Sequence, residues 1–475
     1  MEQRINNIML AGTGSDVGKS VLSTALCRIF VEDGFRPAPF KAQNMALNSY
    51  VTTDGKEIGR AQAVQAGACC LEATSEMNPV LLKPSSDHTT QVIVNGVAIG
   101  NKSAYEYFKK EGKEYLRNAA HAAFDKLAES YNPIVLEGAG SICELNLKNS
   151  DIVNLSMARY ANAKVILVAD IDRGGVFASC YGSIMLQTPE DKELIKGIII
   201  NKFRGDIKLF EEGKKIIENI CKVPVLGIIP AFEDINIEEE DSVALSRKNA
   251  RTSANKINIA VVLLKHISNF TDFDPLERDK RVNLFYTNSA KDIESADIII
   301  IPGSKSTISD LLELRRNGIA NSIVSAFKSG KKTIGICGGY QMLGKSIKDP
   351  LHAESEIEEI PGLGILDMET CMEKGKTTKQ IEFMYNGEVC RGYEIHQGKS
   401  TLTDLITEEK NCIGTYIHGI FDNNVFINHI LNSICNDRTE TAEEFKEKQY
   451  KNLANHVRKN IDMTKLYEIL KSNDR

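Results

Sequence analysis

The sequence predicts an α/β fold in two consecutive domains, each built around a mostly parallel sheet. Apolar runs without alternation recur along the chain, separated by stretches of helical length, which is typical of parallel strands buried on both faces. Two glycine-rich turns, one ending at Lys19 and one centred on Cys337, each follow such a run in a different half of the chain. The length of 475 residues also exceeds one ordinary core, since domains average about 150 residues.

The composition excludes several classes of protein. A net charge of −6 gives no electrostatic reason to expect nucleic acid or an anionic membrane as a partner. The 11 cysteines include no C-x-x-C pair, so the sequence offers no zinc knuckle and no redox motif. No stretch approaches the roughly 20 apolar residues of a membrane span. We therefore expect a protein of the reducing cytoplasm.

The N-terminal domain is predicted over residues 1–230 as a doubly wound α/β domain. It opens with a strand at Asn7–Leu10, a glycine-bearing loop at Gly12–Gly18, and a helix at Lys19–Phe30 whose apolar residues recur with helical spacing. Four further apolar runs, each followed by turn residues, are predicted strands: Pro133–Leu136, Lys164–Ala169, Gly197–Ile200 and Val225–Ile229.

The segment Gly12–Ser20, GTGSDVGKS, predicts a phosphate site between the first strand and the first helix. Backbone N–H groups in such a loop and at the helix N-terminus hold phosphate oxygens. Lys19 would reach the β- and γ-phosphates of ATP, and Ser20 would ligate Mg²⁺. Thr13 departs from the strict P-loop pattern, and the segment resembles the variant of dethiobiotin synthetase-like P-loop proteins; a chance glycine-rich turn is the alternative. The predicted ATP-binding residues of the loop are Thr13, Gly14, Ser15, Asp16, Val17, Gly18, Lys19 and Ser20.

Polar residues at the ends of later strands are candidates to complete this site. Glu137 closes the run PIVLE, where a carboxylate at the carboxyl edge of a sheet can contact Mg²⁺. Its EGAG segment resembles that of the dethiobiotin synthetase-like family, which implies the same metal role; a capping or ion-paired carboxylate is the alternative. Asp170 and Asp172 are weaker candidates for metal or substrate contacts. Asn201 resembles the adenine-side Asn-Lys motif of related nucleotide binders.

The C-terminal half begins after a break in the apolar runs. Residues 231–256 are acidic and then basic, which predicts an exposed linker. A second α/β series follows over residues 257–440, and the charged residues 441–475 are predicted to form two amphipathic helices. The predicted strands of this half are Ile257–Leu264, Ala296–Ile301, the run before Cys337, Gly392–His396 and Cys412–His418.

The stretch Lys331–Gly344, KKTIGICGGYQMLG, predicts a strand–turn–helix elbow at Cys337. An apolar run ends at the cysteine, Gly335 and Gly339 flank it, and the following residues can open a helix. The sharp turn needs these glycines, because side chains beside the nucleophile would collide with the backbone. A helix start behind the sulfur would stabilise a thiolate. A buried structural cysteine is the alternative interpretation.

Further residues of the second half fit a nucleophilic cysteine. The elbow continues to Gln341, and His418 ends the run CIGTYIH. Gly303 follows the run ADIIII, where backbone N–H groups can stabilise an oxyanion. This set resembles the class I glutamine amidotransferases, which implies Cys337 as nucleophile and His418 as base and acid. The resemblance also implies oxyanion or glutamine contacts from Gly303, Gly338 and Gln341.

One position departs from that family's pattern. Most class I members carry a glutamate two residues after the histidine, and here Ile420 takes that place. The cobalamin-pathway branch of the family shares this departure, so the third member of the triad is missing or supplied elsewhere. His396, in YEIHQG, is a less favoured alternative base.

The two halves together suggest an amide ligase. ATP would convert a carboxylate into an acyl phosphate, and ammonia from glutamine would displace the phosphate. In this order the chain resembles the cobyric acid synthase family, through segments that include Pro39–Thr52, Met77–Pro84, Asn201–Asp206 and Gly392–Ser400. Polar residues of Lys41–Asn48 are candidates to meet the substrate, and a polar surface loop is the alternative.

The resemblance to the cobyric acid synthases implies a specific reaction. It implies amidation of the b, d, e and g carboxylates of adenosylcobyrinic acid a,c-diamide, with glutamine and a corrinoid as substrates and with ATP and Mg²⁺. The a,c-diamide synthases, which have the same two domains, are the nearest alternative. A P-loop switch ATPase with a degenerate glutaminase half is an alternative of another class. The order of amidation, the route of ammonia and the oligomeric state stay open.

Overall fold

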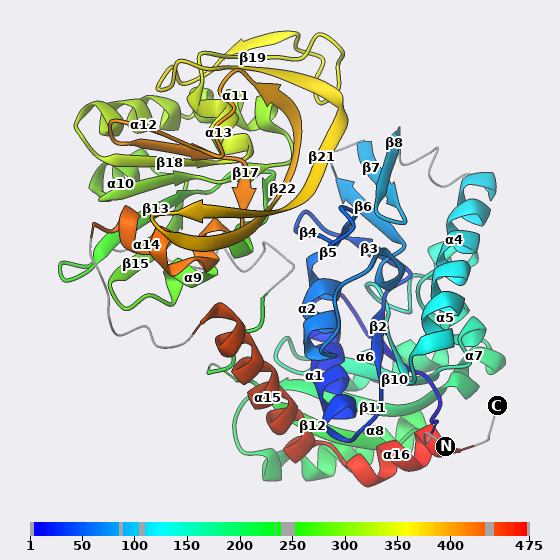
Figure 1. Ribbon diagram of the computed structural model, residues 1–475. Coiled ribbons are helices and arrows are strands. Elements are labelled where there is room, and N and C mark those ends of the chain that lie inside the picture. The colour runs from blue at the N-terminus through cyan, green and yellow to red at the C-terminus, as the bar shows by residue number, and fades with distance from the viewer. Residues whose placement is uncertain are drawn as a thin grey trace.

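Two domains, each organised around a parallel sheet, form the protein (Figure 1). The computed structural model describes residues 4–84, 89–103, 110–232, 234–238, 252–432 and 441–472. No helix in these ranges is long and apolar enough to cross a membrane. The two-domain α/β fold predicted from the sequence is confirmed.

The first sheet has six parallel strands in the order β12–β11–β10–β1–β9–β2. They are β1 (Ile8–Gly12), β2 (Ala38–Phe40), β9 (Ile134–Glu137), β10 (Lys164–Asp170), β11 (Ile195–Phe203) and β12 (Val225–Pro230). All but β2 coincide with predicted runs, because side chains on both faces of these strands are buried. Since β1 lies between β10 and β9, the loop after it opens at the carboxyl edge of the central strands.

Helices and smaller sheets surround this first sheet. The helices are α1 (Lys19–Glu32), α2 (Arg60–Ala68), α4 (Lys110–Ser130), α5 (Leu155–Tyr160), α6 (Val176–Met185), α7 (Pro189–Leu194) and α8 (Glu211–Cys221). A four-stranded sheet contains β3 (Gln43–Met45), β6 (Val80–Pro84), β7 (Thr89–Val94) and β8 (Val97–Ser103). Between β3 and β6 in the chain, β4 (Ser49–Val51) and β5 (Glu57–Gly59) pair as a short ribbon.

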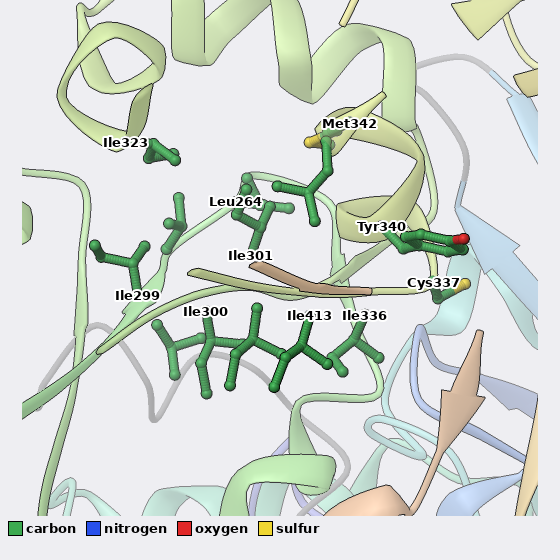
Figure 2. Close-up of a cluster of buried hydrophobic side chains, with 14 of the residues drawn as sticks. Leu264, Ile299, Ile300, Ile301, Ile323, Ile336, Cys337, Tyr340, Met342 and Ile413 are labelled. Atoms are coloured by element: carbon green, nitrogen blue, oxygen red, sulfur yellow. The ribbon is translucent and has the colours of Figure 1, made fainter. Parts of the chain in front are cut away.

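The second domain has a six-stranded sheet in the order β15–β13–β16–β18–β24–β23, parallel except for β23. These strands are β13 (Ile257–Val262), β15 (Val282–Thr287), β16 (Ile298–Ile301), β18 (Lys332–Ile336), β23 (Ile406–Glu409) and β24 (Cys412–Thr415). Its helices are α9 (Asp274–Glu277), α10 (Ala290–Ser295), α11 (Thr307–Arg316), α12 (Ile319–Lys328), α13 (Gly338–Leu343) and α14 (Asn424–Ile430). Figure 2 shows Ile300, Ile336 and Ile413 packed together beneath these strands, with Cys337 at their end.

A five-stranded sheet of the second domain faces the first domain. It contains β19 (Ser346–Lys348), β20 (Glu359–Pro361), β21 (Glu369–Tyr385), β22 (Glu388–Ser400) and β25 (Ile417–His418). The long hairpin β21–β22 curves toward the ribbon β4–β5 (Figure 1). The segments β14 (Ile267–Ser268) and β17 (Gly303–Ser304) form a separate antiparallel pair.

The prediction of one strand over Cys412–His418 is wrong. The run divides into β24, which continues the parallel sheet beside β18, and β25, which pairs with β22. Thr415 marks the division: its Oγ1 donates to Leu405 O at 2.6 Å and accepts from Ile417 N at 3.0 Å. The chain therefore changes sheets just before His418.

The predicted exposed linker is partly buried at its start. Phe232, Ile235 and Ile237 pack against a hydrophobic cluster of the first domain, and Glu238 pairs with Arg60 at 2.6 Å. The prediction of an exposed linker is therefore wrong for residues 231–232 and 234–238, because the apolar side chains of this stretch pack against the first domain. Residues 254–256 at the other end are exposed, as predicted, and residues 239–251 lie outside the described ranges.

The ribbon β4–β5 and the hairpin β21–β22 join the two domains. Glu57 on β5 accepts from Lys376 on β21 at 2.5 Å and from Lys83 on β6 at 2.9 Å. Thr378 Oγ1 donates to Gly55 O at 2.6 Å. Burial opposes ionisation of Glu57, but the two ammonium groups outweigh it and lower its pKa. Removing one partner of such a buried pair costs about 3–5 kcal/mol, so this contact fixes the domains against each other.

The C-terminal helices return to the first domain. Helices α15 (Ala442–Asn460) and α16 (Met463–Lys471), red in Figure 1, lie along α1 and β12. Their apolar faces bury Leu453, Val457 and Leu466 in a cluster with Ile8 and Leu10 of β1. The two amphipathic helices expected from the sequence are present, and their target is the sheet that carries the glycine-rich loop.

Leu453→Ala is expected to lower the free energy of unfolding of the first domain by about 2–5 kcal/mol, because it leaves a cavity between α15 and α1. The side chain of Leu453 is 0% exposed. The shift in urea midpoint, followed by circular dichroism, measures the change. Asn455→Ala, on the exposed side of the same helix, is the matched control and should change stability by less than about 0.5 kcal/mol. An equally small effect of Leu453→Ala would show that α15 does not belong to this core.

Candidate functional site

The glycine-rich loop leads from β1 into α1 and surrounds the end of Lys19. Lys19 Nζ donates to Gly14 O at 2.9 Å and to Gly140 O at 3.0 Å. Gly18 has φ +96°, and a Cβ there would lie 2.1 Å from Asn201 Nδ2, so only glycine fits. The loop therefore presents a lysine charge and the start of a helix at one place, as a phosphate site requires.

Asn201 lies behind the loop. Its Nδ2 donates to Val17 O at 2.8 Å, which supports the loop from the side of β11. Lys202 pairs with Asp170 at 3.1 Å, and Asp172 pairs with Arg204 at 3.0 Å. Lys202 lines the cavity beside the loop, whereas Asn201 is not among the lining residues. A nucleotide contact from Asn201 stays a prediction.

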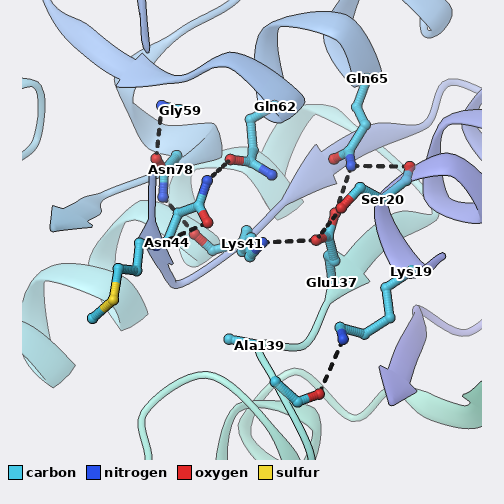
Figure 3. A network of polar contacts seen from close by, with 12 residues as sticks. Lys19, Ser20, Lys41, Asn44, Gly59, Gln62, Gln65, Asn78, Glu137 and Ala139 are labelled. Carbon is cyan, nitrogen blue, oxygen red and sulfur yellow. Dashed lines mark hydrogen bonds and ion pairs between the residues drawn. The ribbon is translucent and has the colours of Figure 1, made fainter. Parts of the chain in front are cut away.

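Glu137, at the end of β9, is the centre of a buried polar network (Figure 3). Its Oε1 accepts from Ser20 Oγ at 2.8 Å and from Lys41 Nζ at 2.7 Å, and its Oε2 accepts from Gln65 Nε2 at 2.6 Å. Burial opposes ionisation, but Lys41, together with Gln65 and Ser20, lowers the pKa of Glu137. The sequence did not indicate Lys41 and Gln65 as its partners, because they lie on other elements.

The donor set at Glu137 fits a magnesium ion. A hydroxyl oxygen from Ser20 and a carboxylate from Glu137 are hard oxygen ligands, and Mg²⁺ is usually held by one or two carboxylates together with substrate phosphates. Within the described part of the chain, no group of three or more His, Cys, Asp or Glu side chains forms a protein-only metal site. The metal roles of Ser20 and Glu137 stay predictions.

A cavity of about 1360 Å³ opens beside the loop and Glu137. Apolar, cationic and acidic side chains line it together with residues of the loop, and Gln43, Asn44 and Met45 of β3 are also among its lining residues. The apolar residues include Ile142, Leu147, Ile152 and Val153, the cations include Lys113, Lys148 and Arg159, and the acids include Asp151, Glu190 and Asp191. A cavity of this size can hold a nucleotide together with a second ligand.

Cys337 lies in a strained turn between β18 and α13. It has φ +52° and ψ −109°, a conformation that costs energy for a residue with a Cβ. A Cβ on Gly339 would lie 2.0 Å from Ile301 O, so the elbow depends on glycine there. Cys337 Sγ lies 3.6 Å from Ile395 O. The structure therefore contains the predicted strand–turn–helix elbow with the sulfur at its tip.

His418 has an acidic partner that the sequence did not reveal. His418 Nδ1 lies 2.6 Å from Asp272 Oδ2, and Asp272 Oδ1 accepts from Gly419 N at 3.0 Å. Burial disfavours the charged ring, but Asp272 outweighs it, with a further contribution from Cys337, and the pKa of His418 rises to about 10. Among the described residues, the buried Nε2 has no hydrogen-bond partner. The geometry is that of a nucleophile, a base and an orienting carboxylate.

Asp272 contacts His418 where most class I amidotransferases use the glutamate that Ile420 replaces in this sequence. It lies on the short helix η5 (Phe270–Phe273), 146 positions before His418 in the chain. Ile420 itself is buried in the hydrophobic core. The acidic stretch TDFD was the only signal available in the sequence, and nothing in it tells which fold position meets the histidine.

Two of the predicted oxyanion and glutamine residues, Gly303 and Gly338, lie beside the Cys337–His418 pair. A Cβ on Gly303 would lie 3.3 Å from His418 Cε1, and one on Gly338 would lie 2.9 Å from Ser304 N. Gln341 Nε2 donates to Gln397 O at 2.8 Å. The alternative base His396 is instead stacked on Tyr416, with centroids 3.9 Å apart. The structure thus brings Gly303 and Gly338 beside the Cys337–His418 pair and favours His418 over His396.

Comparison with known proteins gives the family. The model of the CobQ/CobB/MinD/ParA nucleotide binding domain matches residues 8–244, and that of the CobB/CobQ-like glutamine amidotransferase domain matches residues 258–426. A cobyric acid synthase of Bacteroides fragilis is 57% identical over 495 aligned residues, which cover 100% of both chains. The chain belongs to the cobyric acid synthase family.

Other cobyric acid synthases match along the same length. That of Phocaeicola vulgatus is 56% identical and covers 100% of both chains, and that of Caldanaerobacter subterraneus is 45% identical and covers 98% of both. The resemblance found in the sequence is confirmed, with a nucleotide-binding half followed by a glutamine amidotransferase half.

The substitution Asp272→Asn is expected to lower the kcat of glutamine hydrolysis by roughly 10²-fold or more, because the imidazole of His418 loses the carboxylate that orients it. Without the carboxylate, the pKa of His418 falls below about 10, so the ring loses its proton at lower pH. Nuclear magnetic resonance titration of the ring nitrogens measures this shift. Asp367→Asn, at an exposed carboxylate, is the control. An unchanged titration of His418 would contradict the role given to Asp272.

Proposed function

We propose that this chain is a glutamine-hydrolysing, ATP-dependent amide ligase, a cobyric acid synthase that amidates the b, d, e and g carboxylates of adenosylcobyrinic acid a,c-diamide. The observation that carries the proposal is the end-to-end match to cobyric acid synthases. It is supported by the two sites on one chain, with Cys337, His418 and Asp272 in one domain and Lys19 and Glu137 in the other. Glutamine, ATP and a corrinoid are the substrates.

In the glutaminase half, the Cys337 thiolate attacks the side-chain amide carbon of glutamine. His418 Nε2–H gives its proton to the departing nitrogen, the carbon–nitrogen bond breaks, and ammonia and a glutamyl thioester result. The neutral His418 then takes a proton from water as the water attacks the thioester, which releases glutamate and restores the thiolate. A pKa of about 10 supports this role, because His418 is protonated at neutral pH before the first step. Backbone N–H groups near Gly303 and Gly338 are the proposed oxyanion donors.

In the synthase half, a substrate carboxylate attacks the γ-phosphorus of ATP. ADP leaves and an acyl phosphate forms; ammonia then attacks the acyl carbon, and phosphate leaves as the amide is made. Lys19 holds the charge that develops on the transferred phosphoryl group. Mg²⁺, when bound, neutralises charge on the phosphates, and Ser20 and Glu137 are its proposed ligands.

The lining of the large cavity supports an acidic, partly apolar acceptor. Lys148 and Arg159 both pair with Asp191, so a peripheral carboxylate would bind there by sharing these cations, and the apolar side chains near Ile152 can contact a macrocycle edge. We assign the acceptor to this part of the cavity. The remaining carboxylates would bind the cations while one is activated beside Glu137.

Mass spectrometry of the corrinoid after incubation with ATP, Mg²⁺ and glutamine tests the proposal. Four added amides are the expected result. Two added amides would assign the chain to a,c-diamide synthase activity instead. No added amide, with no ammonia released from glutamine, would identify a P-loop switch protein.

A further inference from the structure

Two side chains hold the imidazole of His418 in place. Asp272, on η5, contacts its Nδ1 at 2.6 Å. Tyr393, on β22, stacks on the ring, with centroids 5.4 Å apart and planes at 25°. The orientation of Nε2 toward the sulfur therefore depends on where η5 and Tyr393 lie.

The segment Asn48–Ser49 of the other domain, where β4 begins, contacts both of these supports. Asn48 Oδ1 accepts from Phe270 N at 3.2 Å, and Asn269 Oδ1 accepts from Ser49 N at 2.9 Å. This reciprocal pair joins the segment to the start of η5. Tyr393 O–H donates to Ser49 O at 3.2 Å, which joins the same segment to the stacked ring.

These hydrogen bonds are buried, so losing one of them is energetically costly. Asn48 and Ser49 are 0% exposed, and Asn269 is 2% exposed. A buried N–H group that loses its acceptor costs about 1–3 kcal/mol, so the segment Asn48–Ser49 and η5 are held in one arrangement. Asn269 also has φ +52°, the left-handed conformation that asparagine tolerates better than most residues.

We propose that Asn48 and Ser49 are positioning residues for the glutaminase base, supplied by the N-terminal domain. They act through η5 and Asp272 on Nδ1 of His418, and through Tyr393 on the plane of its ring. The inference rests on the proposed function, because it takes His418 as the base. It makes the glutaminase site complete only when the two domains are docked.

The same segment of chain begins at the ATP site. Lys41 pairs with Glu137 at 2.7 Å, Asn44 and Met45 then line the large cavity, and the chain reaches the interface at Asn48. One continuous segment thus contacts both sites. This gives a reason for the N-terminal domain to position the base, since ammonia made without a docked acceptor site is lost to solvent.

Tyr393→Phe is the sharpest test, because it keeps the ring on His418 and removes only the hydroxyl that reaches Ser49. We expect the kcat of glutamine hydrolysis to fall about tenfold, the size of effect that one lost hydrogen bond produces. The KM for glutamine and amidation with ammonium salts should stay within about twofold of the parent. The pH titration of the His418 ring should also shift.

Asn48→Ala should reduce kcat at least as much, measured on protein whose urea midpoint shows that it folds. Since Asn48 is fully buried, this variant can lose the fold, and Tyr393→Phe then decides alone. Tyr385→Phe is the matched control, because that ring lies on β21 of the same sheet and packs against Phe426 and His429.

Two results would overturn the inference. One is Tyr393→Phe with the parent kcat for glutamine and an unchanged His418 titration. The other is an equal loss of glutamine-dependent and ammonia-dependent amidation, which would mean general damage to the domain contact. Failure of the proposed function is distinguishable, because glutamine hydrolysis is measured without any corrinoid.

Discussion

Cys337→Ala is expected to abolish amidation with glutamine and to leave amidation with ammonium salts intact. The variant removes the thiol at the strained elbow, so no thioester forms and no ammonia is released from glutamine. The synthase half keeps its loop and Glu137, because these lie in the other domain. Product amides, counted by mass spectrometry with each nitrogen source, measure both outcomes.

The loss with glutamine should exceed about 10⁴-fold, since covalent catalysis has no substitute at this site. Cys371→Ala is the matched control, because this cysteine is exposed on β21. Failure of ammonium salts to rescue a folded Cys337→Ala protein would refute the division of labour between the domains.

Lys19→Ala is expected to remove amidation with either nitrogen source. Its ammonium is held by Gly14 O and Gly140 O, at the start of α1, where we propose that the transferred phosphoryl group binds. Loss of a charge that stabilises the transition state lowers kcat by roughly 10²–10³-fold or more. Initial rates of ADP formation, in the presence of corrinoid and ammonia, measure the effect.

Lys215→Ala, on the exposed side of α8, is the control for a lost lysine charge. The glutaminase reaction of the Lys19→Ala protein can be followed separately, because Cys337 lies in the other domain. Retention of ammonia-dependent turnover by Lys19→Ala at saturating ATP would contradict the phosphate site assigned to the glycine-rich loop.

Local patterns predicted most of the central strands. The runs that became β1, β10 and β12 are buried on both faces, so their sequences lack alternation and stand out from the surface. The prediction of one strand over Cys412–His418 failed because hydrophobic periodicity does not show that the chain moves from one sheet to another at Thr415. That change depends on a side-chain hydrogen bond to Leu405, which is a tertiary contact.

For the two sites as well, the sequence indicated residues on local motifs and did not indicate residues that meet through tertiary contacts. Lys19 and Cys337 could be proposed as site residues from the sequence because each lies on one contiguous motif whose glycines are needed by the backbone. Asp272, Lys41 and Gln65 were not assigned to their partners, because each reaches its site from a separate element. Residue type gave no signal there, since a buried carboxylate or amide looks the same in sequence whether it orients a base or caps a turn.

The docking of α15 and α16 on the first sheet has a consequence for synthesis on the ribosome. Domains usually fold in order from the N-terminus as they emerge. Here the cluster around Ile8 and Leu10 also needs Leu453 and Leu466, which are translated after the entire glutaminase domain. The domain that emerges first is therefore the last to finish its core, and nascent chains that end before residue 441 carry an uncovered apolar face that favours aggregation.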